Sequence, residues 1–135
     1  MATWQASFRF VAGAAGLPAD YRARFATVLP LERSWSAEIE QWGAIDGDCI
    51  EVSDGPWLPD IRCRIDLREW RPALYERLVE CLRGIGGELE TDDGETVLLD
   101  LRSFEQALRA SSAAEFVASP ADFLERLRNA KAPGL

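Results

Sequence analysis

Apolar and polar residues alternate in some stretches of the chain and return at helical spacing in others, which predicts a mixed α and β protein. The alternation at 4–11 is typical of a half-buried strand, and the one at 61–68 is the clearest in the sequence. Apolar residues recur at intervals of three and four at 21–29 and at 74–85, where Pro72 stands at the favoured first position of a helix. These segments predict two strands and two helices.

Two hairpins are predicted where an Asp-Gly pair separates short runs of strand-forming residues. The pairs are Asp46-Gly47 and Asp93-Gly94. The second is the pair that a two-residue turn prefers, because both of its residues then take a positive φ. The strands joined in this way are 34–42 with 49–52, and 88–91 with 95–99.

The end of the chain carries two further helix signals. Ser103 and Gln106 have the spacing of a capping box, and Ser119, Pro120 and Asp122 can begin a second terminal helix. The resulting order, β-α-β-β-β-α-β-β-α-α, predicts an α+β fold, an antiparallel sheet with helices on one face. A ferredoxin-like core plus C-terminal helices is the preferred form, and any other α+β sheet is the alternative. No interdomain linker interrupts the 135 residues, so we expect one domain, 1–135.

The net charge of −8 limits the partners of the protein. Its field repels a phosphate backbone, so we expect no binding to nucleic acid. The N-terminal segment lacks a basic start, and Arg9 interrupts its apolar stretch. We therefore expect neither a secretory signal nor a membrane span, and a cytoplasmic location.

The absence of histidine removes the commonest general base and every His-ligated metal arrangement. Cys49, Cys63 and Cys81 are an odd number without a C-x-x-C spacing, which predicts free and mostly buried thiols. We therefore expect no catalytic site, no cofactor and no metal.

A set of three acidic residues offers an alternative to this expectation. Asp46, Asp48 and Glu51 supply the oxygen ligands that hard cations prefer, but the further ligands of a calcium loop are missing. A hairpin turn with solvated acids explains the same residues.

Acidic residues are concentrated in two segments that contain no basic residue. Seven of the 23 acids lie between Arg33 and Arg62, and six lie between Arg83 and Arg102. The first segment also contains tryptophans, and aromatic side chains rimmed by charge are typical interface anchors. An ordinary solvated face is the alternative. The predicted contact surface consists of Glu38, Glu40, Trp42, Asp46, Asp48, Glu51, Asp54 and Trp57.

The stretch Trp42-Gly43, the segment 46–57 and the run Arg64-Ile65-Asp66-Leu67 together cover about a quarter of the chain. They resemble the short acidic, tryptophan-rich cores of small bacterial immunity proteins that neutralise polymorphic toxins. The resemblance implies an inhibitor of a secreted or contact-delivered toxin, often a nuclease.

The predicted function is therefore that of a non-catalytic protein-binding module, most concretely an immunity protein that binds and inhibits a bacterial toxin. Its partner is expected to be a basic protein, because the proposed surface is acidic. Two alternatives stay open. One is a small ligand-binding or assembly domain, and the other is a metal-dependent hydrolase that uses Asp46, Asp48 and Glu51.

Overall fold

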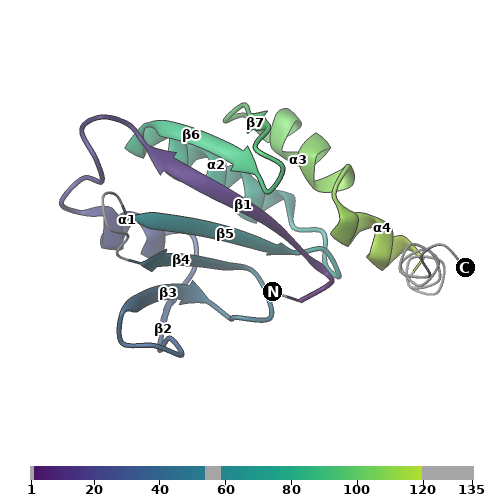
Figure 1. Ribbon diagram of the computed structural model, residues 1–135, viewed down its shortest axis with the longest axis horizontal. Helices are drawn as coiled ribbons and strands as arrows, with labels where there is room; N and C mark the ends of the chain where they lie inside the picture. The colour runs from purple at the N-terminus through teal and green to yellow at the C-terminus, as the bar shows by residue number, and fades with distance from the viewer. Residues whose placement is uncertain (1, 54–58, 120–135) are drawn as a thin grey trace, which may run out of the picture.

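The computed structural model describes residues 2–53 and 59–119, in which one antiparallel sheet packs against helices (Figure 1). Within these ranges the chain forms seven strands and four helices. In chain order they are β1 (Gln5–Ala12), α1 (Tyr21–Ala26), β2 (Leu31–Glu32), β3 (Ile39–Gly43), β4 (Cys49–Ser53), β5 (Asp60–Asp66), α2 (Pro72–Ile85), β6 (Gly87–Thr91), β7 (Thr96–Val97), α3 (Leu101–Arg109) and α4 (Ser112–Ala118).

The sheet has the strand order β2-β3-β4-β5-β1-β6-β7, and neighbouring strands are antiparallel throughout. The first strand, β1, lies between β5 and β6. Phe8 of β1 therefore stands opposite Cys63 on one side and opposite Thr91 on the other. The pairing of β1 with β6 begins only at Phe8, so the start of β1 has no strand neighbour on that side.

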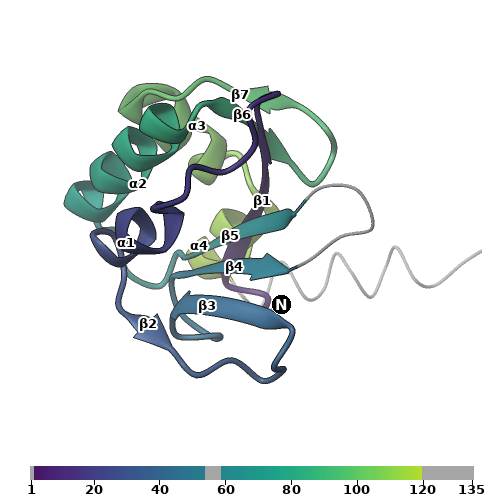
Figure 2. The ribbon, with the colours of Figure 1, turned by 90° about the vertical axis from the view of Figure 1, so that its left-hand side faces the viewer.

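The core lies on one face of the sheet because side chains alternate along each strand. On β5, Ile61, Cys63 and Ile65 are buried, whereas Arg62 and Arg64 point to the opposite side, which we call the open face. Figure 2 shows α1, α2 and α3 together on one side of the sheet. The predicted α+β architecture, with an antiparallel sheet and helices on one face, is confirmed at this level.

The helix predicted after Pro72 has the bounds Pro72–Ile85, and it ends where Gly86 takes a positive φ of 85°. Its apolar side is buried, with Leu74, Leu78 and Leu82 in the core. None of the helices in 2–53 and 59–119 combines the length and apolar composition that a membrane span requires.

The strand predicted at 34–42 begins later, at Ile39. Ser34 and Ser36 form a local turn instead, because the Ser34 hydroxyl donates to the carbonyl of Ser36 and the amide of Ile39 bonds back to the same carbonyl at 3.2 Å. Such local hydrogen bonds compete with pairing between strands. Trp35 consequently lies outside the sheet and is 69% exposed.

The turn between β6 and β7 also differs from the prediction. Only Gly94 has a positive φ, of 83°, and Asp93 does not. The amide of Gly94 bonds to the carbonyl of Thr91, and the amide of Thr91 bonds to the carbonyl of Glu95. This is a three-residue loop with glycine at the left-handed position, and it holds Asp92 and Asp93 at its tip.

The cap of the first terminal helix was predicted at the wrong residue. Asp100, not Ser103, is the N-cap of α3, and its carboxylate accepts from the Ser103 amide at 2.7 Å. The sequence patterns do not predict α4 as a separate helix; it follows the N-cap Ser111. The helix predicted from Pro120 and Asp122 lies outside the described residues.

We expect Leu78→Ala to lower the free energy of unfolding by about 2 to 5 kcal/mol, because it truncates a side chain that is 2% exposed within the core. Urea unfolding measures the loss. Glu76→Ala, on the exposed side of the same helix, is the matched control and should change stability by less than about 0.5 kcal/mol. Equal effects of the two substitutions would contradict the assignment of the buried face.

Candidate functional site

The described residues of the predicted contact surface do not gather on one surface. Asp54 and Trp57 lie outside the described residues. The other six are placed by β3, by β4 and by the residues before and between these strands: Glu38, Glu40, Trp42, Asp46, Asp48 and Glu51. Their environments differ, as follows.

Trp42 is part of the hydrophobic core and not of a surface. It is 0% exposed and stands opposite Ile50 of β4 on the helical face of the sheet. Its ring packs edge-on against Phe25 of α1, with centroids 5.1 Å apart, and near Tyr21 at 6.4 Å. The prediction that Trp42 contacts a partner is therefore wrong, because the side chain is covered by α1.

Glu40 lies on the same side of β3 as Trp42 and bonds to α1. The Tyr21 hydroxyl and the Arg22 guanidinium both donate to its carboxylate. Burial by itself raises the pKa of Glu40, but the hydrogen bonds from Arg22 and Tyr21 outweigh it and the pKa is lowered. This acid therefore fastens α1 to the sheet.

Asp48 joins three elements at one end of the sheet. Its carboxylate accepts from the backbone amide of Asp66, at the end of β5, at 2.7 Å. It also accepts from Nη1 of Arg71, the N-cap residue of α2, at 3.0 Å. The Asp48 side chain is 5% exposed, and this burial raises its pKa although both hydrogen bonds oppose the shift.

Glu51 lies on the open face, where it forms an ion pair with Arg64 of β5. Both side chains are largely buried, and Cys49 Sγ is 4.0 Å from the Glu51 carboxylate. The neighbouring Gln41 is also buried, with its Oε1 unpaired and its Nε2 donating to the carbonyl of Gly43. Glu51 is therefore engaged within the fold.

Only Glu38 and Asp46 of the six are exposed. The backbone around Asp46 is nevertheless fixed, because its carbonyl accepts from Trp4 Nε1 at 2.8 Å and from Arg68 at 3.3 Å. The Arg68 guanidinium also stacks on the Trp4 ring, 4.1 Å from its centroid. The six described residues are thus divided among the core, which holds Trp42, three arginine pairs, which hold Glu40, Asp48 and Glu51, and two exposed acids.

A metal site at Asp46, Asp48 and Glu51 gains no support from this geometry. Asp48 and Glu51 are bonded to separate arginines, and Asp46 is exposed in the turn. In 2–53 and 59–119, no group of three or more Cys, Asp or Glu side chains converges in a way that can hold a metal ion.

The cysteines are free, as predicted: Cys49 and Cys63 are buried and Cys81 is half-buried. Burial raises the pKa of the Cys63 thiol to about 12 and that of Cys81 to about 11. Few thiolates are therefore present near neutral pH.

The second acidic segment, in contrast, projects from one edge of the sheet as the β6–β7 hairpin. Asp92, Asp93 and Glu95 are exposed on its loop. Asp92 lies 3.5 Å from Arg62, but within the described ranges neither Asp93 nor Glu95 forms an ion pair. This hairpin keeps uncompensated negative charge in one place.

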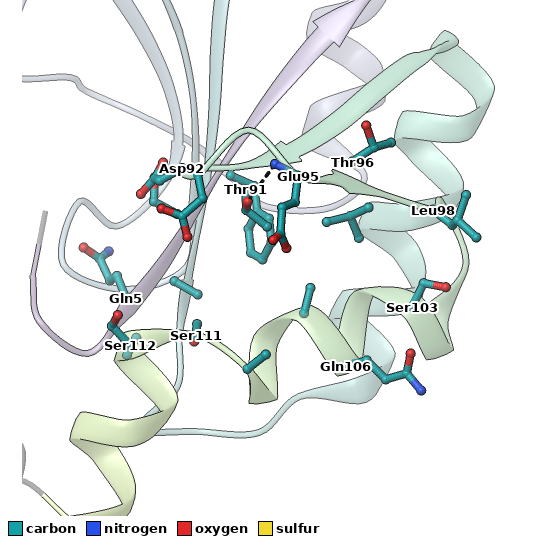
Figure 3. A pocket seen from close by; sticks show the side chains of 18 residues that line it. Gln5, Thr91, Asp92, Glu95, Thr96, Leu98, Ser103, Gln106, Ser111 and Ser112 are labelled. Carbon is teal, nitrogen blue, oxygen red and sulfur yellow. Dashed lines mark hydrogen bonds between the residues drawn. The ribbon is translucent and has the colours of Figure 1, made fainter.

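A cavity of about 480 Å³ lies between the hairpin and the junction of α3 and α4 (Figure 3). It exists because β6 turns away after Thr91, so that the start of β1 is uncovered on that side and α4 packs there. Hairpin acids, hydroxyl groups and apolar side chains line it together. The lining comprises residues 5–8, 91–93, 95–98, 103, 106, 107 and 110–113.

Sequence reasoning missed this cavity because one of its walls, residues 5–8, is far in the chain from the walls formed by 91–98 and 103–113. The run of small residues from Ala110 to Ala114 was the available signal, since short side chains at a helix junction leave space.

Comparison of the chain with protein-family models, with curated proteins and with solved structures finds no match in any of the three.

We expect slow modification of the thiols by iodoacetamide at pH 8, since raised pKa values and burial keep them protonated and covered. Mass spectrometry of the native protein and of the protein in urea compares the two states. Rapid labelling of two or more cysteines in the native protein would contradict the burial described above.

We expect Asp48→Ala to lower the free energy of unfolding by about 1 to 3 kcal/mol, because the Asp66 amide loses its acceptor. Asp48→Asn keeps an oxygen that can accept from this amide, so its free energy of unfolding should fall by less. Asp46→Ala, which removes an exposed carboxylate, is the control.

The variant Asp48→Asn also tests how the stability of the fold depends on pH. Because the pKa of Asp48 is raised above 3.8 in the folded protein, the fold holds this proton more tightly than the unfolded chain does. The stability of the wild type relative to Asp48→Asn should therefore fall as the pH rises from 3.8 through the raised pKa. Denaturation at several pH values measures the difference, and an increase with pH would contradict the assignment.

Proposed function

We propose that this protein is a non-catalytic binding module for a basic protein partner, and that the β6–β7 hairpin carries the contact surface. The observation behind this proposal is the group of exposed acids, Asp92, Asp93 and Glu95, on one short loop. Like charges held close together repel one another, and a partner of opposite charge relieves that repulsion. The most concrete form is an immunity protein that binds and inhibits a bacterial toxin, possibly a nuclease, in the cytoplasm.

This proposal moves the contact surface away from the residues that the sequence favours. Trp42, Glu40, Asp48 and Glu51 are occupied within the fold, so their contribution to an encounter with a partner is small. Among the residues that the structure describes, Asp93 and Glu95 form no ion pair, and Asp92 contacts Arg62. Exposed charge of one sign mainly accelerates association, and apolar contacts then hold the complex.

We propose further that the strands β4-β5-β1-β6 with α1 and α2 form a ferredoxin-like core. In support, β1 and β4 run in the same direction with β5 between them, since each is antiparallel to β5. This is the split β-α-β arrangement. The β2–β3 addition, β7 and the terminal helices then extend this core at its edges.

A second candidate function is the binding of a small ligand, and the cavity of about 480 Å³ supports it. Its volume lies within the range of about 300 to 1,000 Å³ that small-molecule sites occupy. Apolar walls with a few polar groups are the usual lining of such sites.

We expect reversal of charge at the hairpin, in the double variant Asp93→Lys and Glu95→Lys, to slow association with the partner by about tenfold or more at low salt. The partner is first captured from the native cell and identified by mass spectrometry. Surface plasmon resonance at two ionic strengths then measures the association rate.

The matched control is Glu38→Lys with Asp46→Lys, which makes the same charge change at exposed acids of the first segment. A smaller effect of this control supports the hairpin as the contact surface. Equal association rates for the hairpin variant and the wild type would refute the proposed function at this surface.

A further inference from the structure

The cavity beside the β6–β7 hairpin has an apolar wall. Ala6 and Phe8 of β1 and Val97 of β7 line it and belong to the hydrophobic core. Leu98 continues this wall to the outside and is 67% exposed. A long aliphatic group lying along these side chains removes apolar surface from water.

The cavity also carries negative charge. Asp92, Asp93 and Glu95 are among its lining residues, and within 2–53 and 59–119 no lysine or arginine lines it. Figure 3 shows the Glu95 side chain extending from the hairpin towards the helical side of the cavity, while its backbone amide is fixed by the Thr91 hydroxyl at 3.2 Å. The cavity therefore offers carboxylates to a cation.

The helical side contributes further groups that can accept hydrogen bonds. Gln106 lines the cavity and is exposed, and Figure 3 shows its side chain extending away from the hairpin. Ser111 also lines it; its hydroxyl donates to the carbonyl of Leu108 at 2.6 Å and accepts from the amide of Ala114 at 3.2 Å, which leaves one lone pair of the oxygen to accept a further hydrogen bond. A ligand with several N–H donors matches this side better than an anion does.

We propose that the cavity binds the side chain of an arginine or lysine that the protein partner presents. The aliphatic stem lies along the apolar wall, and the cationic head group binds the carboxylates of Asp93 and Glu95. The inference rests on the proposed function, because it names what the basic partner inserts at the same hairpin. It adds a specific anchor to a surface that otherwise attracts the partner by charge alone.

The test uses N-acetyl-arginine methylamide as the probe and N-acetyl-citrulline methylamide as its neutral counterpart of nearly the same shape. NMR titration of the labelled full chain follows the amides of the lining residues. We expect saturable shifts with the arginine probe and an affinity at least about fivefold higher than for the citrulline probe, which corresponds to a charge-assisted hydrogen bond.

Two variants locate the binding. Glu95→Gln removes one carboxylate and should weaken the arginine probe by about fivefold or more, whereas Glu88→Gln, an exposed acid on β6 outside the cavity lining, should not. Ala110→Leu fills the cavity from an exposed position and should weaken both probes. Thermal unfolding checks that each variant is folded.

Absence of saturable shifts, equal affinities for the two probes, or shifts that persist unchanged in both Glu95→Gln and Ala110→Leu would overturn the inference. Its failure is distinguishable from that of the proposed function. If hairpin charge reversal slows association while the probe does not bind, the inference fails and the function stands. If the probe binds as expected while charge reversal leaves association unchanged, the cation site stands and the proposed surface for the partner fails.

Discussion

The alternation of side chains along the central strands determines most of this structure. On β1 and β5 every second residue is apolar and faces the helices, so the residues between them must face the open side of the sheet. The helices consequently share one face, and Arg9, Arg62 and Arg64 share the other. The same rule divides any acidic run that falls on a strand. Glu40 and Glu51 are both in the first acidic segment, yet they point to opposite faces.

Side chains on a loop do not have to alternate between the two faces, which explains why the acids of the β6–β7 loop remain exposed. Asp92 and Asp93 lie at the tip of a three-residue loop whose glycine allows the turn, so their side chains are not assigned to alternate faces. Glu40 of β3 and Glu51 of β4 instead meet arginines from α1 and β5, and Asp48, immediately before β4, meets the arginine that caps α2. Buried carboxylates need such partners, because an unpaired charge in the interior is costly. Those acids therefore stabilise the junctions between elements.

The sequence predicted the regular elements well where one physical signal was strong. The bounds of α2 follow from Pro72, its leucine spacing and Gly86, and β5 follows from seven alternating residues. The failures occur where a local bond competes with a pattern. Ser34 and Ser36 end the alternation before Ile39, and Asp100 replaces Ser103 as the cap because its carboxylate reaches the amide three residues ahead. The arginine partners of Glu40, Asp48 and Glu51 were not predictable, because they depend on how distant elements pack.

The position of the hairpin also determines where the proposed basic partner can approach. The arginines of the open face, Arg9 and Arg62, lie near Asp60 and Asp92, so the charges on this face partly cancel. In the described part of the chain, Asp93 and Glu95 after β6 form no ion pair, and β7 is only two residues long and carries no charge. Exposed acids without an ion pair therefore lie at the edge of the sheet beside α3, where the cavity opens. Under the proposed function, the basic partner guided to this edge meets the exposed apolar surface of Leu98 within the same contact, so attraction and anchoring share one location.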